Sequence, residues 1–159
     1  DLIEKLKRNA LNRAVRPDKI TLAALQSVLH LYQNPRRLKS ELPLFRWLSR
    51  DLSEINKVAN RLLKPLQAYC SGYDVVVAPS DTQVGSGALP VAVLRSVALK
   101  ITFSHRRGSG KALSNLSRAF RELPTPVIGR ITKDSLFFDL RCLEDEKNFI
   151  ENLKDLKIP

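Results

Sequence analysis

Apolar side chains recur at intervals of three and four residues in the first part of the chain, which is the spacing of one face of a helix. Three helices are predicted on this basis, at residues 2–11, 20–33 and 51–69. Pro17 disfavours the α conformation of the residue before it, so a bend or an extended stretch is expected over residues 12–19. Residues 36–50 are predicted to form a basic connector that is irregular or made of short helices.

After residue 72 the apolar pattern changes to short runs rich in β-branched residues, separated by turn residues. The predicted order is strand, strand, helix, strand, strand, helix, at residues 73–78, 94–102, 111–123, 126–132, 135–141 and 144–156. Lys133 and Asp134 are expected to form the turn of a hairpin between the last two strands. This order predicts an α+β fold, with a mostly antiparallel small sheet, helices on one face, and a helical segment before it.

Two domains are expected from this change of pattern. Residues 51–159 should form a compact carboxy-terminal α+β domain. Residues 1–50 are interpreted as the tail of another, larger domain followed by linking helices. The chain begins with Asp1 and shows no signal-peptide layout, so we expect it to be cut from a longer polypeptide.

The composition is that of a folded, non-membrane protein. Of the 159 residues 43% are hydrophobic, which is enough apolar material for a core, and 27% are charged. No apolar run approaches the ~20 residues that cross a bilayer, so no membrane partner is expected. Cys70 and Cys142 have no CxxC or nearby histidine spacing, which argues against a metal site and favours a reducing, cytoplasmic location.

The net charge of +11, with a pI near 10.1, favours an anionic partner. Nucleic acid, phosphorylated substrates and acidic proteins all fit this charge. The alternative is a basic surface, as in a thermophile, with no specific partner.

No catalytic constellation can be assembled from the sequence. His30 and His105 have no evident acid–base partner, and no nucleophile has a base nearby along the chain.

The loop Gly108-Ser109-Gly110-Lys111 lacks the spacing of a phosphate loop. Two interpretations of residues 104–110 stay open, contact with a nucleic-acid backbone and a solvated loop. The small-residue loop at residues 85–90 either lines a pocket or only turns the chain.

Arg13 and Arg16 are the strongest candidates for a binding role. They are three residues apart, so on a helical turn their side chains would project from neighbouring positions. Two converging guanidinium groups suit a phosphate-like oxyanion, since each donates two parallel hydrogen bonds. The spacing alone favours the alternative, two solvated surface arginines.

Three stretches occurring in the same order resemble the bacterial selenocysteine synthase family, whose members are L-seryl-tRNA(Sec) selenium transferases. They are Arg13–Leu25, Ser80–Pro90, and Pro126–Ile131 followed by Phe138–Arg141. The resemblance covers residues 1 to about 150. It departs from the family at Pro17, where Val is usual, and at Ser86, where Gly is usual.

The resemblance implies the carboxy-terminal part of a fold-type-I enzyme that depends on pyridoxal phosphate. Such an enzyme replaces the serine hydroxyl of seryl-tRNA(Sec) with selenium from selenophosphate. The family's cofactor lysine lies upstream of this segment, so we expect no catalytic or cofactor-binding residue here, and an inactive fragment. The implied partners are tRNA(Sec), selenophosphate and further copies in a homodecamer of five dimers, in the cytoplasm.

The resemblance also implies residue roles. Arg13 and Arg16 match the arginines that hold selenophosphate. Arg130 either faces the active cleft or forms an ion pair at the edge of the core. The candidates for RNA contact are these basic residues: Arg36, Arg37, Lys39, Arg106 and Arg107. Two other identities stay open, another fold-type-I enzyme such as a cysteine desulfurase, and a tRNA-binding module.

Overall fold

The computed structural model describes residues 1–83, 93–105 and 108–158. The small-residue loop at residues 85–90, with Ser86, and two of the suggested RNA contacts, Arg106 and Arg107, lie outside the described residues. Backbone contacts divide the chain into two compact units, Asp1–Arg46 and Trp47–Pro159. The division lies close to the predicted boundary between residues 50 and 51, and each unit is described by itself.

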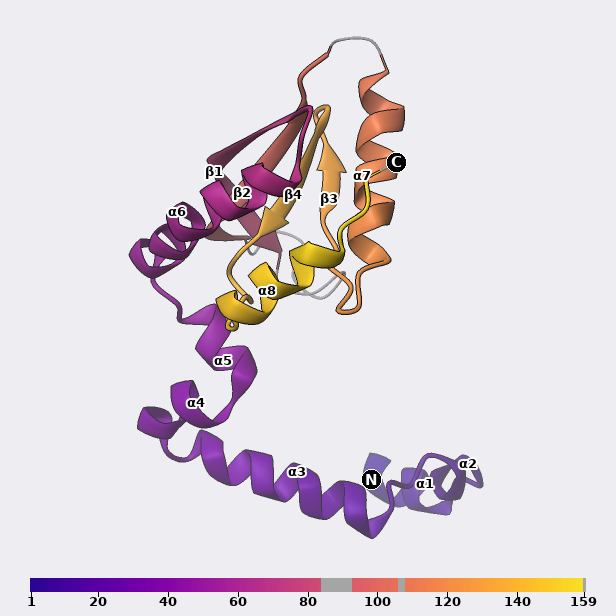
Figure 1. The fold of residues 1–159 in the computed structure, drawn as a ribbon. Helices are drawn as coiled ribbons and strands as arrows, with labels where there is room; N and C mark the ends of the chain where they lie inside the picture. The colour runs from indigo at the N-terminus through magenta and orange to yellow at the C-terminus, as the bar shows by residue number, and fades with distance from the viewer. Residues whose placement is uncertain (84–92, 106–107, 159) are drawn as a thin grey trace. The chain divides into compact units, whose positions relative to one another are not determined.

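The amino-terminal unit is helical. Its helices are α1 (Leu2–Arg8), α2 (Leu11–Ala14), α3 (Lys19–Tyr32), α4 (Pro35–Glu41) and the start of α5 (Pro43–Leu48) (Figure 1). The prediction of one helix over residues 2–11, followed by an extended stretch, was wrong in detail. Asn9 is extended, and its side-chain oxygen accepts a hydrogen bond from the Leu11 amide at 2.9 Å, so α1 ends and a new helix begins.

None of the helices α1 to α5 contains a buried side chain. The apolar stripe that predicts α3 is present, but its members are all exposed: Leu22, Leu25, Val28, Leu29 and Tyr32. Apolar burial is the main favourable term in folding. Because these helices bury no side chain within this chain, burial contributes little to their stability.

The carboxy-terminal unit contains an antiparallel sheet of four strands: β1 (Tyr73–Gln83), β2 (Val93–Phe103), β3 (Arg130–Thr132) and β4 (Ser135–Asp139). Their order in the sheet is β1-β2-β4-β3. Val75 lies opposite Ile101, which lies opposite Leu136, so one face of β1, β2 and β4 is apolar. The predicted α+β class with an antiparallel sheet is confirmed.

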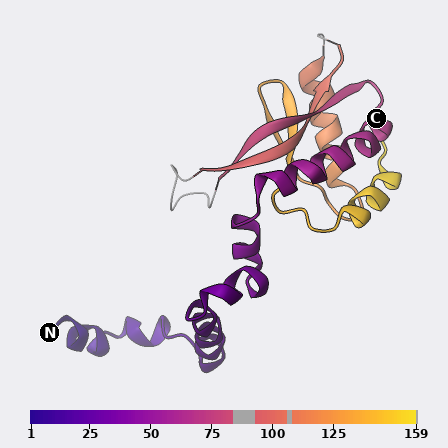
Figure 2. The ribbon, with the colours of Figure 1, turned by 90° about the vertical axis from the view of Figure 1, so that its left-hand side faces the viewer.

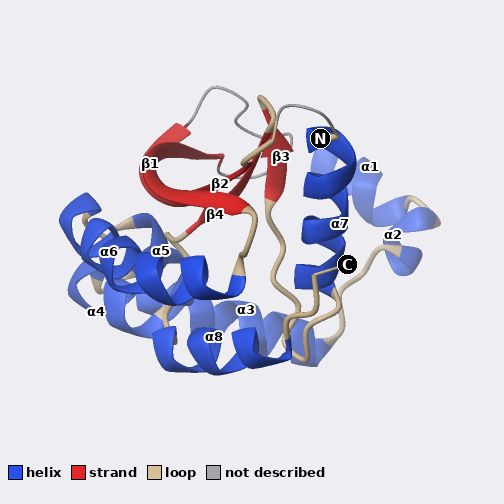
Figure 3. Cartoon of the chain, turned by 45° about the horizontal axis from the view of Figure 1, so that its top comes forward, coloured by secondary structure: helices blue, strands red, loops and turns tan. Residues whose placement is uncertain are grey.

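Three helices cover that apolar face: α6 (Leu52–Tyr69), α7 (Ser109–Arg121) and α8 (Glu146–Asn152), the last continued by a 3-10 turn at Leu153–Asp155 (Figure 3). Helix α6 runs along the β1–β2 ribbon (Figure 2). The core between helices and sheet includes these fully buried side chains: Ile55, Leu62, Leu66, Leu99, Ile101, Leu113, Leu116, Phe120 and Leu136. Within the helices, these buried residues recur with the helical spacing that the sequence pattern predicts.

The predicted hairpin at Lys133 and Asp134 is confirmed. Both residues have positive φ, 47° and 51°, as a two-residue turn between twisted strands requires. The predicted strand over residues 126–132 begins only at Arg130. The Val127 amide donates to the Phe120 carbonyl at 2.9 Å, so this segment bonds to the end of α7 instead of to β4.

Candidate oxyanion site

The corner between α1 and α2 positions the predicted site residues. Asn9 begins α2 through its side chain, and the Asn12 amide donates to the Lys7 carbonyl at 3.5 Å. The second bond ties the first turn of α2 to the last turn of α1. Arg13 therefore lies at the end of a short helix whose start is held against its neighbour.

The nearest acidic residue after the two arginines is engaged elsewhere. The Asp18 carboxylate accepts hydrogen bonds from the Ile20 and Thr21 amides at 2.8 and 2.9 Å and from the Thr21 hydroxyl at 2.7 Å, which begins α3. These bonds from Thr21 hold the pKa of Asp18 below its usual value. Asp18 therefore acts as a helix cap and not as a counter-ion for Arg16.

Arg13 and Arg16 line one open hollow of about 770 Å³. The remaining lining residues carry no negative charge: Lys7, Asn9, Ala10 and Asn12. Within the described part of the chain, neither arginine side chain makes a hydrogen bond or an ion pair. Two guanidinium groups with free donors and no acid beside them can bind a phosphate-like oxyanion.

Arg130 lies in the carboxy-terminal unit, where the sequence left its role open. Its guanidinium donates to the Ser80 hydroxyl at 3.1 Å and to the Asp81 carbonyl at 3.3 Å, and lies 5.8 Å from the centre of the Phe137 ring. Among the described residues it forms no ion pair, so the expected core-edge ion pair is absent. Arg130 instead ties β3 to β1 across the sheet.

Asp139, at the end of β4, is a polar centre that we did not predict. Its carboxylate accepts hydrogen bonds from the hydroxyls of Ser80, Thr82 and Ser96, at 3.2, 2.6 and 2.7 Å, and from the Arg141 amide at 3.0 Å. The sequence gives only a weak indication of this centre, which is the placing of a serine and a threonine two residues apart at Ser80 and Thr82. Only the strand register brings those hydroxyls to one carboxylate.

The glycine-rich segment at residues 108–111 does not form a phosphate loop. Gly108 has a φ of +82° and begins α7, whose first turn contains Lys111. His105 packs its ring edge-on against Phe103, with centroids 5.5 Å apart. His30 contacts the Gln33 side chain at 3.4 Å within α3 and its C-cap. Neither histidine is paired with an acid–base partner in the described residues.

Of the suggested RNA contacts, three lie on α4: Arg36, Arg37 and Lys39. Arg37 forms an ion pair with Glu41 at 2.5 Å, which reduces its availability to a phosphate. Nothing in the structure distinguishes the other two from ordinary surface residues.

Pyridoxal phosphate, the expected cofactor, requires a lysine whose amine is desolvated enough to lose its proton and form a Schiff base. No lysine in the described residues is buried. The hydrogen bond to Glu151 raises the pKa of Lys154, which favours its protonated form. The lysines of this chain therefore do not fit the cofactor.

Among the described residues no group of three or more histidine, cysteine or acidic side chains is placed to hold a metal ion. The helices in the same ranges include none that is both long and apolar enough to cross a membrane.

The fold and the hollow define an α+β protein with a cationic, acid-free hollow on its helical segment. Its sequence matches the profile of the L-seryl-tRNA selenium transferase (SelA) family over residues 1–144, and the chain belongs to that family. It is 49% identical over 152 residues to an L-seryl-tRNA(Sec) selenium transferase of Klebsiella pneumoniae strain 342, covering 96% of this chain and 32% of the relative.

A relative with the same description from Escherichia fergusonii is 47% identical over 154 residues, covering 96% of this chain and 33% of the relative. The chain therefore spans about one third of the length of the curated relatives that it matches. The resemblance found in the sequence is confirmed at the level of the family.

Proposed function

We propose that this chain is the carboxy-terminal part of a pyridoxal-phosphate-dependent selenium transferase that converts seryl-tRNA(Sec) to selenocysteinyl-tRNA(Sec) with selenophosphate. The observation that carries the proposal is the hollow that Arg13 and Arg16 line together and that no acidic residue lines. Family membership supplies the reaction class. The cofactor, when bound in the whole enzyme, supplies an electron sink for removal of the serine hydroxyl.

In this proposal Arg13 and Arg16 bind and orient the oxyanion of the selenium donor. Each guanidinium offers a planar pair of N–H donors that matches two oxygens of a tetrahedral anion. The hollow is open in this chain, and exposed charges are screened by water and salt. The rest of the enzyme would strengthen the site by excluding that water.

The partners and the location that we propose rest on membership of the family. The partners are tRNA(Sec), selenophosphate and other copies in a decamer of five dimers, and the location is the cytoplasm. The charge of +11 supports an RNA partner. By itself the chain is proposed to be inactive, because none of its lysines is buried and so none offers a place for the cofactor.

The test uses the full-length enzyme loaded with cofactor. Arg13→Ala and Arg16→Ala should each lower selenium transfer at limiting selenophosphate by about ten-fold or more, while binding of seryl-tRNA(Sec) changes little. Arg8→Ala is the matched control, because Arg8 lies on α1 and does not line the hollow. Unchanged selenophosphate dependence in both arginine variants would remove the anion role.

The reaction class is tested separately. A full-length wild-type protein that is saturated with cofactor but transfers no selenium to seryl-tRNA(Sec) would favour another fold-type-I enzyme. Selenium transfer with normal turnover would exclude that alternative, whatever the two arginine variants do.

A further inference from the structure

Lys7 lines the same hollow as Arg13 and Arg16, although the sequence pattern does not single it out. It lies in the last turn of α1, where its ammonium is 3.4 Å from the Glu4 carboxylate. Both side chains are more than half exposed, at 66% and 56%. Exposed pairs of this kind are weak, so Glu4 holds Lys7 loosely and can be replaced by a better anion.

One side-chain hydrogen bond joins the Lys7 backbone to the short helix that contains Arg13. Asn12, one residue before Arg13, donates its side-chain amide to the Lys7 carbonyl. Asn9 fixes the start of α2 between them. The lysine and the nearer arginine are thus joined by side-chain bonds at the α1–α2 corner, and their relation does not depend on α3 or on the carboxy-terminal unit.

We infer that Lys7 is the third cation of the oxyanion site and exchanges Glu4 for the bound anion. The inference rests on the proposed function of Arg13 and Arg16. Three positive charges around one hollow favour tetrahedral oxyanions that carry two or more negative charges over monoanions, because the attraction grows with the charge of the ligand. Without a ligand, the Lys7 ammonium lies beside the Glu4 carboxylate. Glu4 therefore competes with the bound anion for Lys7, and a monoanion displaces it poorly.

The experiment measures Kd by calorimetric titration of the full-length enzyme with inorganic phosphate, and with nitrate as the monoanion. Lys7→Ala should weaken phosphate binding by about five- to ten-fold, whereas Lys5→Ala should change it by less than about two-fold. Lys5 is the matched control, since it lies on the same helix and outside the hollow. Lys7→Arg should keep most of the affinity.

Glu4→Gln should act in the opposite direction and tighten phosphate binding by about two- to three-fold, because it removes the competitor for the Lys7 ammonium. Nitrate binding should respond little to any of these changes. Circular dichroism of each variant checks that the protein still folds, and alanine is favourable in a helix.

The outcomes separate the two claims. Equal effects of Lys7→Ala and Lys5→Ala, with phosphate binding lost in Arg13→Ala, would overturn the role of Lys7 and leave the arginine site standing. Phosphate binding that survives Arg13→Ala and Arg16→Ala would instead overturn the site itself. A five-fold or larger loss confined to Lys7→Ala among the lysine variants supports the inference.

Discussion

Arg50 and Arg141 each donate a hydrogen bond to the other's backbone carbonyl, at 3.1 Å in both directions. Arg50 precedes α6 and Arg141 follows β4, so the exchange joins two segments that are far apart in the sequence. The Arg141 side chain is almost fully buried, with 4% exposed. We call this pair of residues the arginine clamp.

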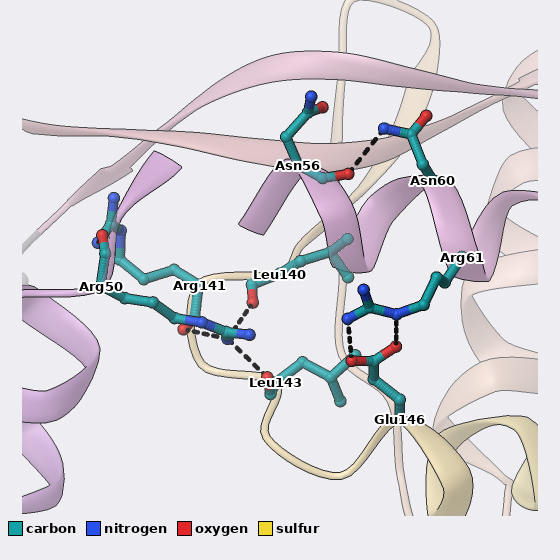
Figure 4. A network of polar contacts seen from close by, with 8 residues as sticks. All are labelled: Arg50, Asn56, Asn60, Arg61, Leu140, Arg141, Leu143 and Glu146. Atoms are coloured by element: carbon teal, nitrogen blue, oxygen red, sulfur yellow. Dashed lines mark hydrogen bonds and ion pairs between the residues drawn. The ribbon is translucent and has the colours of Figure 1, made fainter. Parts of the chain in front are cut away.

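Each guanidinium of the clamp binds several carbonyls. Arg50 also donates to the carbonyls of Leu140 and Leu143, at 3.1 and 2.6 Å (Figure 4). Arg141 also donates to the carbonyls of Trp47, at 3.0 Å, and Arg95. Among the described residues neither arginine has a carboxylate partner, so carbonyl dipoles offset the cost of burying Arg141.

We expect Arg141→Ala to lower the free energy of unfolding by about 2–4 kcal/mol, because it leaves partly buried carbonyls without donors. Arg141→Lys should recover little of this lost stability, since the ammonium of a lysine cannot reach the several carbonyls that a planar guanidinium reaches. The measurement is urea unfolding of the chain. Arg121→Ala is the control, because Arg121 is exposed on α7. Equal midpoints for the Arg141 and Arg121 variants would contradict the clamp.

The second prediction concerns Gly129, which lies where β3 approaches β4. A Cβ at this position would lie 2.8 Å from the Phe137 carbonyl oxygen and 2.8 Å from a carbon of the Phe138 ring. Because the oxygen belongs to the backbone and Phe138 is buried, we expect Gly129→Ala to cost about 1–3 kcal/mol of stability.

The control for this prediction is Gly110→Ala. A Cβ at Gly110 would meet nothing within 4 Å, and the residue lies in the first turn of α7. This change should be neutral or stabilising by up to about 1 kcal/mol. A Gly129 variant as stable as the Gly110 variant would show that β3 has room to move away from β4.

The third prediction is a loss of stability in alkaline solution that Cys70 causes. Burial raises the pKa of the Cys70 thiol from 9.0 to about 12. Between these values the unfolded chain loses the proton while the folded chain keeps it, so stability falls as the pH rises above 9, by up to about 1.4 kcal/mol per pH unit. Below pH 9 this contribution is complete.

Urea unfolding at pH 8.5 and 10 measures this slope. Cys70→Ala should be less stable at both values, because it removes a buried side chain, but its stability should fall less between them. The exposed Cys142 provides a second check. A thiol reagent should label Cys142 in the folded chain well before Cys70, and equal labelling rates would argue against the burial of Cys70.

The fourth prediction compares the two units by hydrogen exchange. Helix α3 has 14 residues and no buried side chain, whereas α6 buries Ile55, Leu62 and Leu66 completely. Amides of α3 should therefore exchange at least about ten-fold faster than those of α6 in this chain. In the full-length enzyme we expect the α3 amides to be slower. Equal protection of the two helices in the chain alone would contradict the description of α3.

Several features were predictable because they depend on local chemistry. The stripe of α6, the change of period after residue 72 and the Lys133–Asp134 turn each follow from spacing and residue type within a few positions. The ends of elements were less predictable. The strand expected over residues 126–132 begins only at Arg130, because Val127 finds its acceptor at Phe120, beyond the reach of a local pattern.

The sequence by itself determined the α+β class and the family, since these depend on periodicity and motifs. Only the tertiary structure decided that Lys7, Arg13 and Arg16 line one hollow, that three hydroxyls converge on Asp139, and that Arg50 and Arg141 bind each other's backbone. The physical reason is that a hydrogen bond or a shared hollow requires atoms within a few ångströms. Residues remote in sequence reach that distance only after the chain has folded.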